Sequence, residues 1–177
     1  MNINKISIGS DAPNQINAII EVPMNADPVK YEMDKESGAV FVDRFIATPM
    51  YYPCNYGFIP HTLGGDGDPL DILVISDFAI ISGAVILVKP IGVLLMEDEK
   101  GMDEKILAVP AKKLNSQYED IDSFDQLPKI LLQKISHFFE HYKDLEKSKW
   151  VKIKGFESVS KAKTLIIESM KRNDKKK

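Results

Sequence analysis

Three aspartates lie within six positions of the segment GGDGDPLDILVIS, residues 64–76, immediately before an apolar run. They are Asp66, Asp68 and Asp71. At about 5 Å separation and an effective dielectric constant of about 20, each pair of carboxylates repels by roughly 3 kcal/mol, so the cluster needs a compensating cation. Its donors are all oxygen atoms, which favours a hard ion such as Mg²⁺ or Mn²⁺ over zinc, because zinc prefers His or Cys ligands.

Two other structures compete as explanations of this cluster. A calcium-binding EF-hand loop would place a ligand at Leu70, a glycine at Asp71 and a glutamate at Asp77, so the match fails at all three positions. A tight turn that uses Asp and Gly for its backbone geometry explains one or two of the aspartates but explains the full DGDPLD poorly. The segment therefore predicts a hard-cation site.

A second acidic segment, MEDEKGMDEK at 96–105, reads as a loop between two apolar strands. Such a run is usually a solvated turn. Asp103 and Lys105, however, are two positions apart where a strand begins, so they project to the same face. If that face meets the first cluster, one site gains further carboxylates and a lysine, and several Mg²⁺ ions can bind together.

Candidate anion-binding side chains come from distant parts of the chain. Lys30 and Glu32 share one face of a predicted strand, and Arg44 interrupts an apolar run, where an inward-pointing arginine needs an anionic partner. The other candidates are the phenols and the lysine at Tyr52, Tyr56, Tyr142 and Lys143. Each alone is more simply a surface lysine, a core tyrosine or an exposed arginine. Together they combine many carboxylates with many fixed cations, which is what metal-assisted phosphoryl transfer requires.

The elements that must position these residues are mainly strands. The β-rich or continuously apolar runs lie at 16–23, 29–34, 39–47, 70–76, 84–96, 104–110 and 150–155. The turn at 35–38 predicts a hairpin, and Pro90 predicts a bulge, bend or edge position. Apolar spacing predicts an amphipathic helix over 125–146, and a terminal helix is expected over 158–171 before a short frayed tail. This order predicts an α+β fold, a small, strongly curled or closed β-barrel flanked by two main helices, whose strand order is not readable.

Composition and charge narrow the function classes. With 177 residues, 44% of them hydrophobic and 28% charged, the chain suits one domain over 1–177. A net charge of −3 provides no basic field for nucleic acid or an acidic membrane. The longest apolar run, 84–96, is interrupted by a lysine and a proline and is too short to span a bilayer, and no secretory signal is expected. A single cysteine, Cys54, fits a reducing compartment, so we expect a cytoplasmic protein in which Cys54 is a buried, inert thiol and Trp150 packs in the core.

Five motifs give the chain a resemblance to a known family: ADPVKYE, GAVFVDRF, YYPCNYGFIPHTL, DGDPLD and HFFEHYKDLE, which begin at residues 26, 38, 51, 66 and 137. Over almost its whole length the chain resembles soluble family I inorganic pyrophosphatases of the bacterial short-chain type. The resemblance implies hydrolysis of pyrophosphate to two phosphates with several Mg²⁺ ions, for which Mn²⁺ or other divalent cations are possible substitutes. It also implies a distorted barrel of the oligonucleotide-binding kind and a homohexamer built from two trimers, with His137 and His141 near a subunit interface.

The resemblance further implies a role for each site residue. Asp68 falls at the position of the general base that faces the nucleophilic water. The metal ligands fall on Asp66, Asp71, Asp98 and Asp103. The phosphate contacts, of which the first three also act in catalysis, fall on Lys30, Arg44, Tyr56, Lys105, Tyr142 and Lys143. The outer acidic and hydrogen-bonding positions of the pocket fall on Glu21, Glu32, Tyr52 and Glu99.

Two other function classes stay open. A metal-dependent hydrolase of a nucleotide or another phosphoanhydride would want a base-stacking aromatic platform, and the sequence marks none. A non-enzymatic module, either a divalent-ion binder or a barrel for single-stranded nucleic acid, is the other class. Nucleic-acid binding needs a basic groove with aromatic side chains, which the net acidity opposes.

Overall fold

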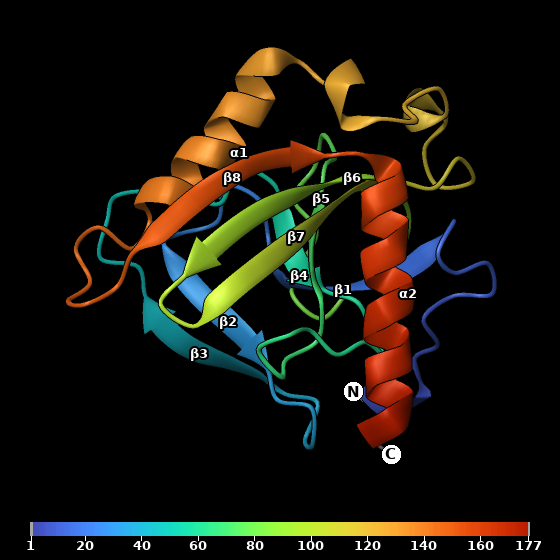
Figure 1. The fold of residues 1–177 in the computed structure, drawn as a ribbon, viewed down its shortest axis with the longest axis horizontal. Helices are drawn as coiled ribbons and strands as arrows, with labels where there is room; N and C mark the ends of the chain where they lie inside the picture. Colours follow the sequence, from blue (N-terminus) through green and yellow to red (C-terminus); the bar gives the residue numbers. More distant parts are fainter. Residues whose placement is uncertain (1, 177) are drawn as a thin grey trace.

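A closed ring of five strands forms the centre of the molecule, whose computed structural model describes residues 2–176. Around the ring the strands follow the order β1 (Ile16–Val22), β4 (Asn55–Phe58), β5 (Asp71–Val74), β7 (Gly101–Pro110) and β6 (Val85–Asp98), and a β1–β6 pairing closes it. β8 (Val151–Glu157) extends the sheet from β6 (Figure 1). The predicted α+β class with a small, strongly curled barrel is confirmed.

The longest strand, β6, bends so that its two halves serve different parts of the sheet. Val85–Val88 pairs with β1, whereas Val93–Asp98 pairs with β8. The register against β7 shifts between Pro90 and Gly92, which confirms the bulge predicted at the proline. The acidic loop expected at 96–105 is wrong, because β6 and β7 stay paired up to Asp98 opposite Gly101, so most of that segment is strand and only Glu99 and Lys100 form the hairpin tip.

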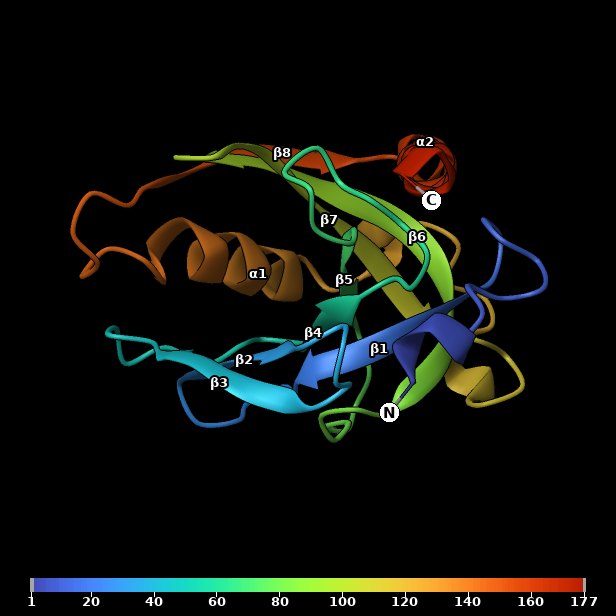
Figure 2. The ribbon, with the colours of Figure 1, turned by 90° about the horizontal axis from the view of Figure 1, so that it is seen from below.

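A separate two-stranded hairpin, β2 (Val29–Met33) and β3 (Val40–Phe45), stands beside the barrel. Its turn is fixed by Asp34, whose Oδ2 accepts hydrogen bonds of 2.7 Å from both the N–H and the hydroxyl of Ser37. Gly38 completes the turn with a φ of 68°, a conformation that favours glycine. The hairpin predicted around 35–38 is thereby confirmed. Figure 2 shows helix α1 (Lys129–His141) between this hairpin and the β7–β6–β8 part of the sheet.

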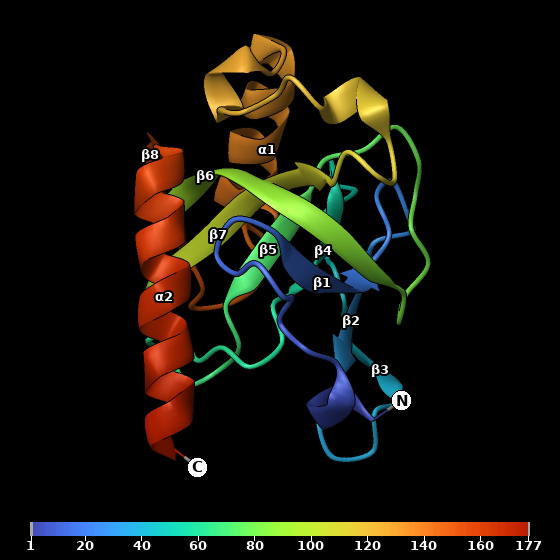
Figure 3. The same cartoon turned by 90° about the vertical axis from the view of Figure 1, so that its right-hand side faces the viewer.

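Two main helices pack on different faces of the barrel. α1 contributes Ile135, Phe138 and Phe139 to one hydrophobic cluster. The terminal helix α2 (Val159–Lys176) packs across β6 (Figure 3) and buries a second set of side chains, Ala162, Leu165 and Ile166. Within residues 2–176, no helix is both long enough and apolar enough to cross a membrane.

Both predicted helix boundaries needed correction. α1 is shorter than 125–146, because Leu127 is extended (ψ of 153°) before Pro128, and the residues preceding it form a separate 3₁₀ turn, η3 (Phe124–Gln126). α2 is longer than expected, since the tail predicted to fray is helical to Lys176, whereas Lys177 lies outside the described residues. Two further 3₁₀ turns are η1 (Ile3–Lys5) and η2 (Ser116–Tyr118).

Three local findings complete the comparison with the sequence. β4 was not predicted as a strand, yet all four of its residues are buried. Trp150 is 47% exposed just before β8, so its predicted place in the core is wrong. Cys54 is buried, and burial raises the pKa of its thiol to about 12, which confirms the expected inert thiol.

Candidate active site

A single pocket of about 150 Å³ gathers every residue that the sequence singled out for the site. It opens between the β2–β3 hairpin, the loop before β5, the β6–β7 tip and the end of α1. The predicted residues that line it are Glu21, Lys30, Glu32, Arg44, Tyr52, Tyr56, Asp66, Asp68, Asp71, Asp98, Glu99, Asp103, Lys105, Tyr142 and Lys143. The fold therefore brings side chains from all five motifs, from the acidic segment at 96–105 and from β1 to one place.

Lys105 lies at the floor of the pocket, where it is only 3% exposed. Its ammonium contacts Asp71 Oδ2 at 2.5 Å and Asp103 Oδ1 at 2.6 Å. Sheet register explains this meeting, because β5 and β7 run parallel with Asp71 opposite Lys105, and Asp103 is two residues away on the same face. The expected contact between the two acidic segments is therefore present.

The buried groups on the pocket floor hold their protons. Burial lowers the pKa of Lys105, but the carboxylates of Asp71 and Asp103 outweigh this and raise it well above its ordinary value. Burial also raises the pKa of Tyr52 and Tyr56 well above the ordinary value, so both side chains are neutral phenols. The hydroxyl of Tyr56 donates a hydrogen bond of 2.8 Å to Asp71 Oδ2.

A second buried ion pair joins the β6–β7 tip to the chain after α1. Lys143 Nζ lies 2.7 Å from Asp98 Oδ2 and 3.5 Å from Glu99 Oε2. The other oxygen of Asp98 accepts a hydrogen bond of 2.8 Å from the Lys100 N–H. Burial raises the pKa of Asp98, but the Lys143 and Lys100 hydrogen bonds outweigh it, and the pKa is lowered overall.

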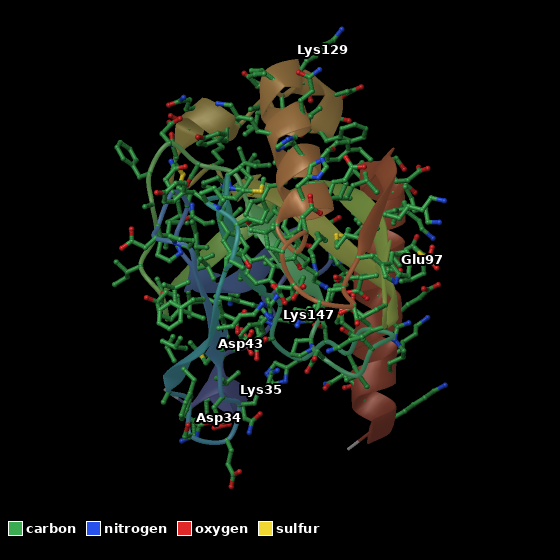
Figure 4. All side chains as sticks on the ribbon, turned by 90° about the vertical axis from the view of Figure 1, so that its left-hand side faces the viewer. Asp34, Lys35, Asp43, Glu97, Lys129 and Lys147 are labelled. Atoms are coloured by element: carbon green, nitrogen blue, oxygen red, sulfur yellow. The ribbon has the colours of Figure 1, made fainter. Side chains whose placement is uncertain are left out.

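The hairpin side of the pocket carries Lys30 and Arg44, which are opposite each other in the β2–β3 register. Lys30 pairs with Glu32, which confirms that the two share a strand face, and its Nζ lies 3.5 Å from Asp43 Oδ2. The anionic partners that Arg44 was expected to need are Asp43, which accepts from Nη1 at 2.7 Å, and Glu146, which accepts from Nε at 3.1 Å. Figure 4 shows Asp43 and Lys35 on this hairpin.

The three aspartates of the opening motif have different surroundings. Asp71 is at the start of β5 beside Lys105, whereas Asp66 and Asp68 belong to a loop closed by a hydrogen bond of 2.6 Å from the Gly64 N–H to the Asp68 carbonyl. The Asp66 side chain accepts a hydrogen bond of 3.1 Å from the Asp68 N–H. Asp68 itself is 66% exposed, with Lys35 Nζ 3.5 Å away.

The chemistry of the donor set fits a hard divalent cation, since carboxylates are the only metal-ligating side chains among the predicted ligands. In the part of the chain that the structure describes, no three such groups are close enough together to hold a metal ion. Lys105 and Lys143 now occupy the positions beside Asp71, Asp103 and Asp98. A metal ion bound by these carboxylates would therefore compete with the lysine ammonium groups for them.

The model of the inorganic pyrophosphatase family matches residues 18–174. The chain belongs to this family. An inorganic pyrophosphatase from Bradyrhizobium diazoefficiens is 59% identical over 177 residues, which is 100% of this chain and 99% of the relative. The structure of an inorganic pyrophosphatase from Coxiella burnetii superposes with a TM-score of 0.91 at 49% identity, covering 94% of this chain and 99% of the other. For the enzyme from Thermus thermophilus the TM-score is 0.93 at 40% identity, covering 98% and 99%.

Sequence reasoning missed part of this pyrophosphatase-family pocket. The other residues that line it are Lys35, Phe58, Pro69, Lys100, Met102, Phe139 and Lys149. Lys35 belongs to the β2–β3 turn and Lys149 to the charged segment between α1 and β8. In the sequence, both positions are typical of solvent-exposed lysines. Asp43 and Glu146 were also missed as partners of Arg44. The sequence did indicate that Arg44 needs an anionic partner, but it did not indicate which residue that is.

The histidine pair lies outside the pocket. His137 and His141 share one face of α1, with ring centroids 4.7 Å apart, and His141 Nδ1 lies 2.9 Å from Asp144 Oδ2. Neither residue lines the cavity. Their predicted place near a subunit interface stays a prediction.

Proposed function

We propose that this chain hydrolyses inorganic pyrophosphate to two phosphates with several bound Mg²⁺ ions, for which Mn²⁺ or other divalent cations are possible substitutes. The observation that carries the proposal is the pocket, which is lined by both carboxylates and fixed cations. Pyrophosphate is a small polyanion, and its metal complexes need both kinds of partner. Membership of the inorganic pyrophosphatase family supports the same activity.

Asp68 is the proposed general base. Asp71 is paired with Lys105 at 2.5 Å and accepts a hydrogen bond from Tyr56. The carboxylate of Asp68, in contrast, is exposed to water, and the cation paired with it, Lys35, is farther away, at 3.5 Å. Such a carboxylate can orient a water molecule and accept its proton. Divalent cations held by Asp66, Asp71, Asp98 and Asp103 would supply activation of that water and neutralisation of phosphate charge.

The fixed cations and phenols are the proposed substrate contacts. Lys30, Arg44, Tyr56, Lys105, Tyr142 and Lys143 would hold the two phosphoryl groups and stabilise charge on the leaving one. Glu21, Glu32, Tyr52 and Glu99 would orient these groups. Removing one contact of this kind commonly lowers the rate by about 10²–10³-fold.

The test is phosphate release from pyrophosphate and from ATP, each in Mg²⁺ with and without a chelator. We expect chelator-sensitive release that is much faster from pyrophosphate. Release only from ATP would instead favour a nucleotide hydrolase, and no release from either would favour the non-enzymatic ion-binding barrel.

Asp68→Asn tests the assigned base within the same assay. This variant is expected to fold normally and to lose about 10²–10³-fold in turnover. Asp120→Asn, an exposed aspartate that does not line the pocket, is the matched control and should retain wild-type turnover. Near-normal hydrolysis by Asp68→Asn would contradict the role of Asp68.

We also propose a homohexamer of two trimers with His137 and His141 near an interface, a single domain over 1–177 and a cytoplasmic location. The family resemblance supports the hexamer and the place of the two histidines, the one barrel with its covering helices supports the single domain, and the buried Cys54 supports the location. Sedimentation should give a mass six times the 19.9 kDa of the chain. A monomer at micromolar concentration would contradict the hexamer.

A further inference from the structure

The loop over residues 64–68 carries two of the proposed functional carboxylates but has little structure of its own. Three of its five positions are glycines, which leave the backbone conformationally free. Gly65, Asp66, Gly67 and Asp68 are all exposed. Its internal hydrogen bonds close the loop on itself and do not attach it to the barrel. Apart from the contact of 3.5 Å between Asp68 Oδ1 and Lys35 Nζ, the position of Asp66 and Asp68 must therefore be set where the loop joins the rest of the molecule.

Leu63, the residue before this loop, is held by the terminal helix through both of its backbone polar groups. Its N–H donates a hydrogen bond of 3.0 Å to the carbonyl of Ser169. Its carbonyl accepts a hydrogen bond of 2.8 Å from Arg172 Nε. The two contacts join residues more than a hundred positions apart, where the β4–β5 connection passes beside α2 (Figure 1).

Near Leu63, α2 is anchored in the hydrophobic core. Ser169 is fully buried, and its hydroxyl donates a hydrogen bond of 2.8 Å to the carbonyl of Ile166, which itself packs in the core. On the other side of the loop, the Leu70 N–H donates a hydrogen bond of 2.9 Å to the hydroxyl of Thr62. The two ends of the loop are thus tied together, and one of them is tied to α2.

We propose that Arg172 is a positioning residue, which holds the Leu63 carbonyl so that Asp66 and Asp68 reach the geometry needed for metal binding and proton transfer. This inference rests on the proposed function. Arg172 does not line the pocket, so it acts only through the loop. A displacement of about 1 Å in a reacting group can lower a rate by about 10²-fold, so a partial loosening of the loop should be visible in kinetics.

The experiment compares Arg172→Met, which keeps the aliphatic stem and removes the donor, with Arg172→Lys, which keeps a charged donor. Lys171→Ala, an exposed neighbour on α2, is the matched control. Amide hydrogen exchange over residues 64–68, turnover, KM for Mg-pyrophosphate and the Mg²⁺ concentration for half-maximal activity are measured well below the thermal midpoint of each variant.

For Arg172→Met we expect exchange at 64–68 to accelerate about tenfold, turnover to fall about tenfold and the Mg²⁺ requirement to rise several-fold. KM should change less than about twofold, because Lys30 and Arg44 are not attached to α2. Arg172→Lys should give intermediate values, and Lys171→Ala should behave as the wild type. If Arg172→Met does not fold, Arg172→Leu carries the same measurements.

Wild-type exchange and turnover in a folded variant without the donor would overturn the inference. Loss of activity only in proportion to the loss of folded protein would also overturn it, because that result describes a purely stabilising role. Absence of pyrophosphate hydrolysis in the wild type would instead overturn the proposed function, whereas the exchange comparison would still decide whether Arg172 fixes the loop.

Discussion

Glu21 offers a sharp test of the electrostatics of this pocket. The residue is 6% exposed on β1, and its Oε1 accepts a hydrogen bond of 2.8 Å from the Met33 N–H. Burial above all, aided by the Asp71 carboxylate, raises the pKa of Glu21 from 4.5 to about 7 against the effect of the Met33 N–H. One pKa unit corresponds to about 1.4 kcal/mol. The rise of the Glu21 pKa from 4.5 to about 7 therefore corresponds to about 3 kcal/mol of folding free energy.

The sign follows from the direction of the pKa change. A carboxyl group with a raised pKa in the folded state contributes stability fully below its unfolded value of 4.5 and loses that contribution as the pH rises through about 7. Glu21→Gln removes the titration. The stability of Glu21→Gln relative to wild type should therefore increase with pH by about 3 kcal/mol, almost entirely between pH 4.5 and 7.5.

Urea unfolding of both proteins in the presence of a chelator, at several pH values from 3.5 to 8, measures this difference. Glu97→Gln is the control of opposite sign, because the hydrogen bond from Lys154, at 2.7 Å, lowers the pKa of the exposed Glu97 (Figure 4). Its effect should appear only as the pH falls toward 4. A difference between Glu21→Gln and wild type that stays flat across this range would refute the reasoning.

Two further substitutions test the packing and the second ion pair. Gly57→Ala would place a Cβ 1.9 Å from the carbonyl oxygen of Ile19 in the neighbouring strand. We therefore expect Gly57→Ala to lower the free energy of unfolding by more than about 4 kcal/mol or to prevent folding. Gly65→Ala is the control and should keep the wild-type thermal midpoint, because its Cβ would have no neighbour within 4 Å. Lys143→Met leaves the buried Asp98 carboxylate without its cation and should destabilise the chelator-treated protein by about 3 kcal/mol in urea unfolding. Asp98→Asn in the same chain should restore most of that loss, and strictly additive losses would contradict the pairing.

The parts of the fold that the sequence could predict are those with local causes. The turn at 35–38 follows from its glycine and its short polar residues, and the bulge follows from the missing N–H of Pro90. Strands rich in β-branched residues were found for the same reason. β4 was missed because it has four residues, one of them a glycine, and nothing in NYGF departs from a loop.

The parts that could not be predicted depend on pairings between distant residues. Closure of the barrel rests on the β1–β6 pairing, and the floor of the site rests on the parallel register that puts Asp71 opposite Lys105. No spacing within either segment fixes that register. The hydrogen bond from Arg172 to Leu63, just before the loop at 64–68, is of the same kind, because it joins segments more than a hundred residues apart. The residue types of the site were therefore readable, and their partners were not.

The pairings also change what the crowding of aspartates means. Repulsion between the carboxylates was the first argument for a metal ion, yet the fold already offsets much of it. Lys105 is shared by Asp71 and Asp103, Lys143 pairs with Asp98, and Asp68 is exposed to water, where repulsion is screened. Charge density alone therefore does not require a metal. The stronger argument is that lysines, an arginine and carboxylates line one small pocket, since such a site offers partners both to metal ions and to phosphate groups.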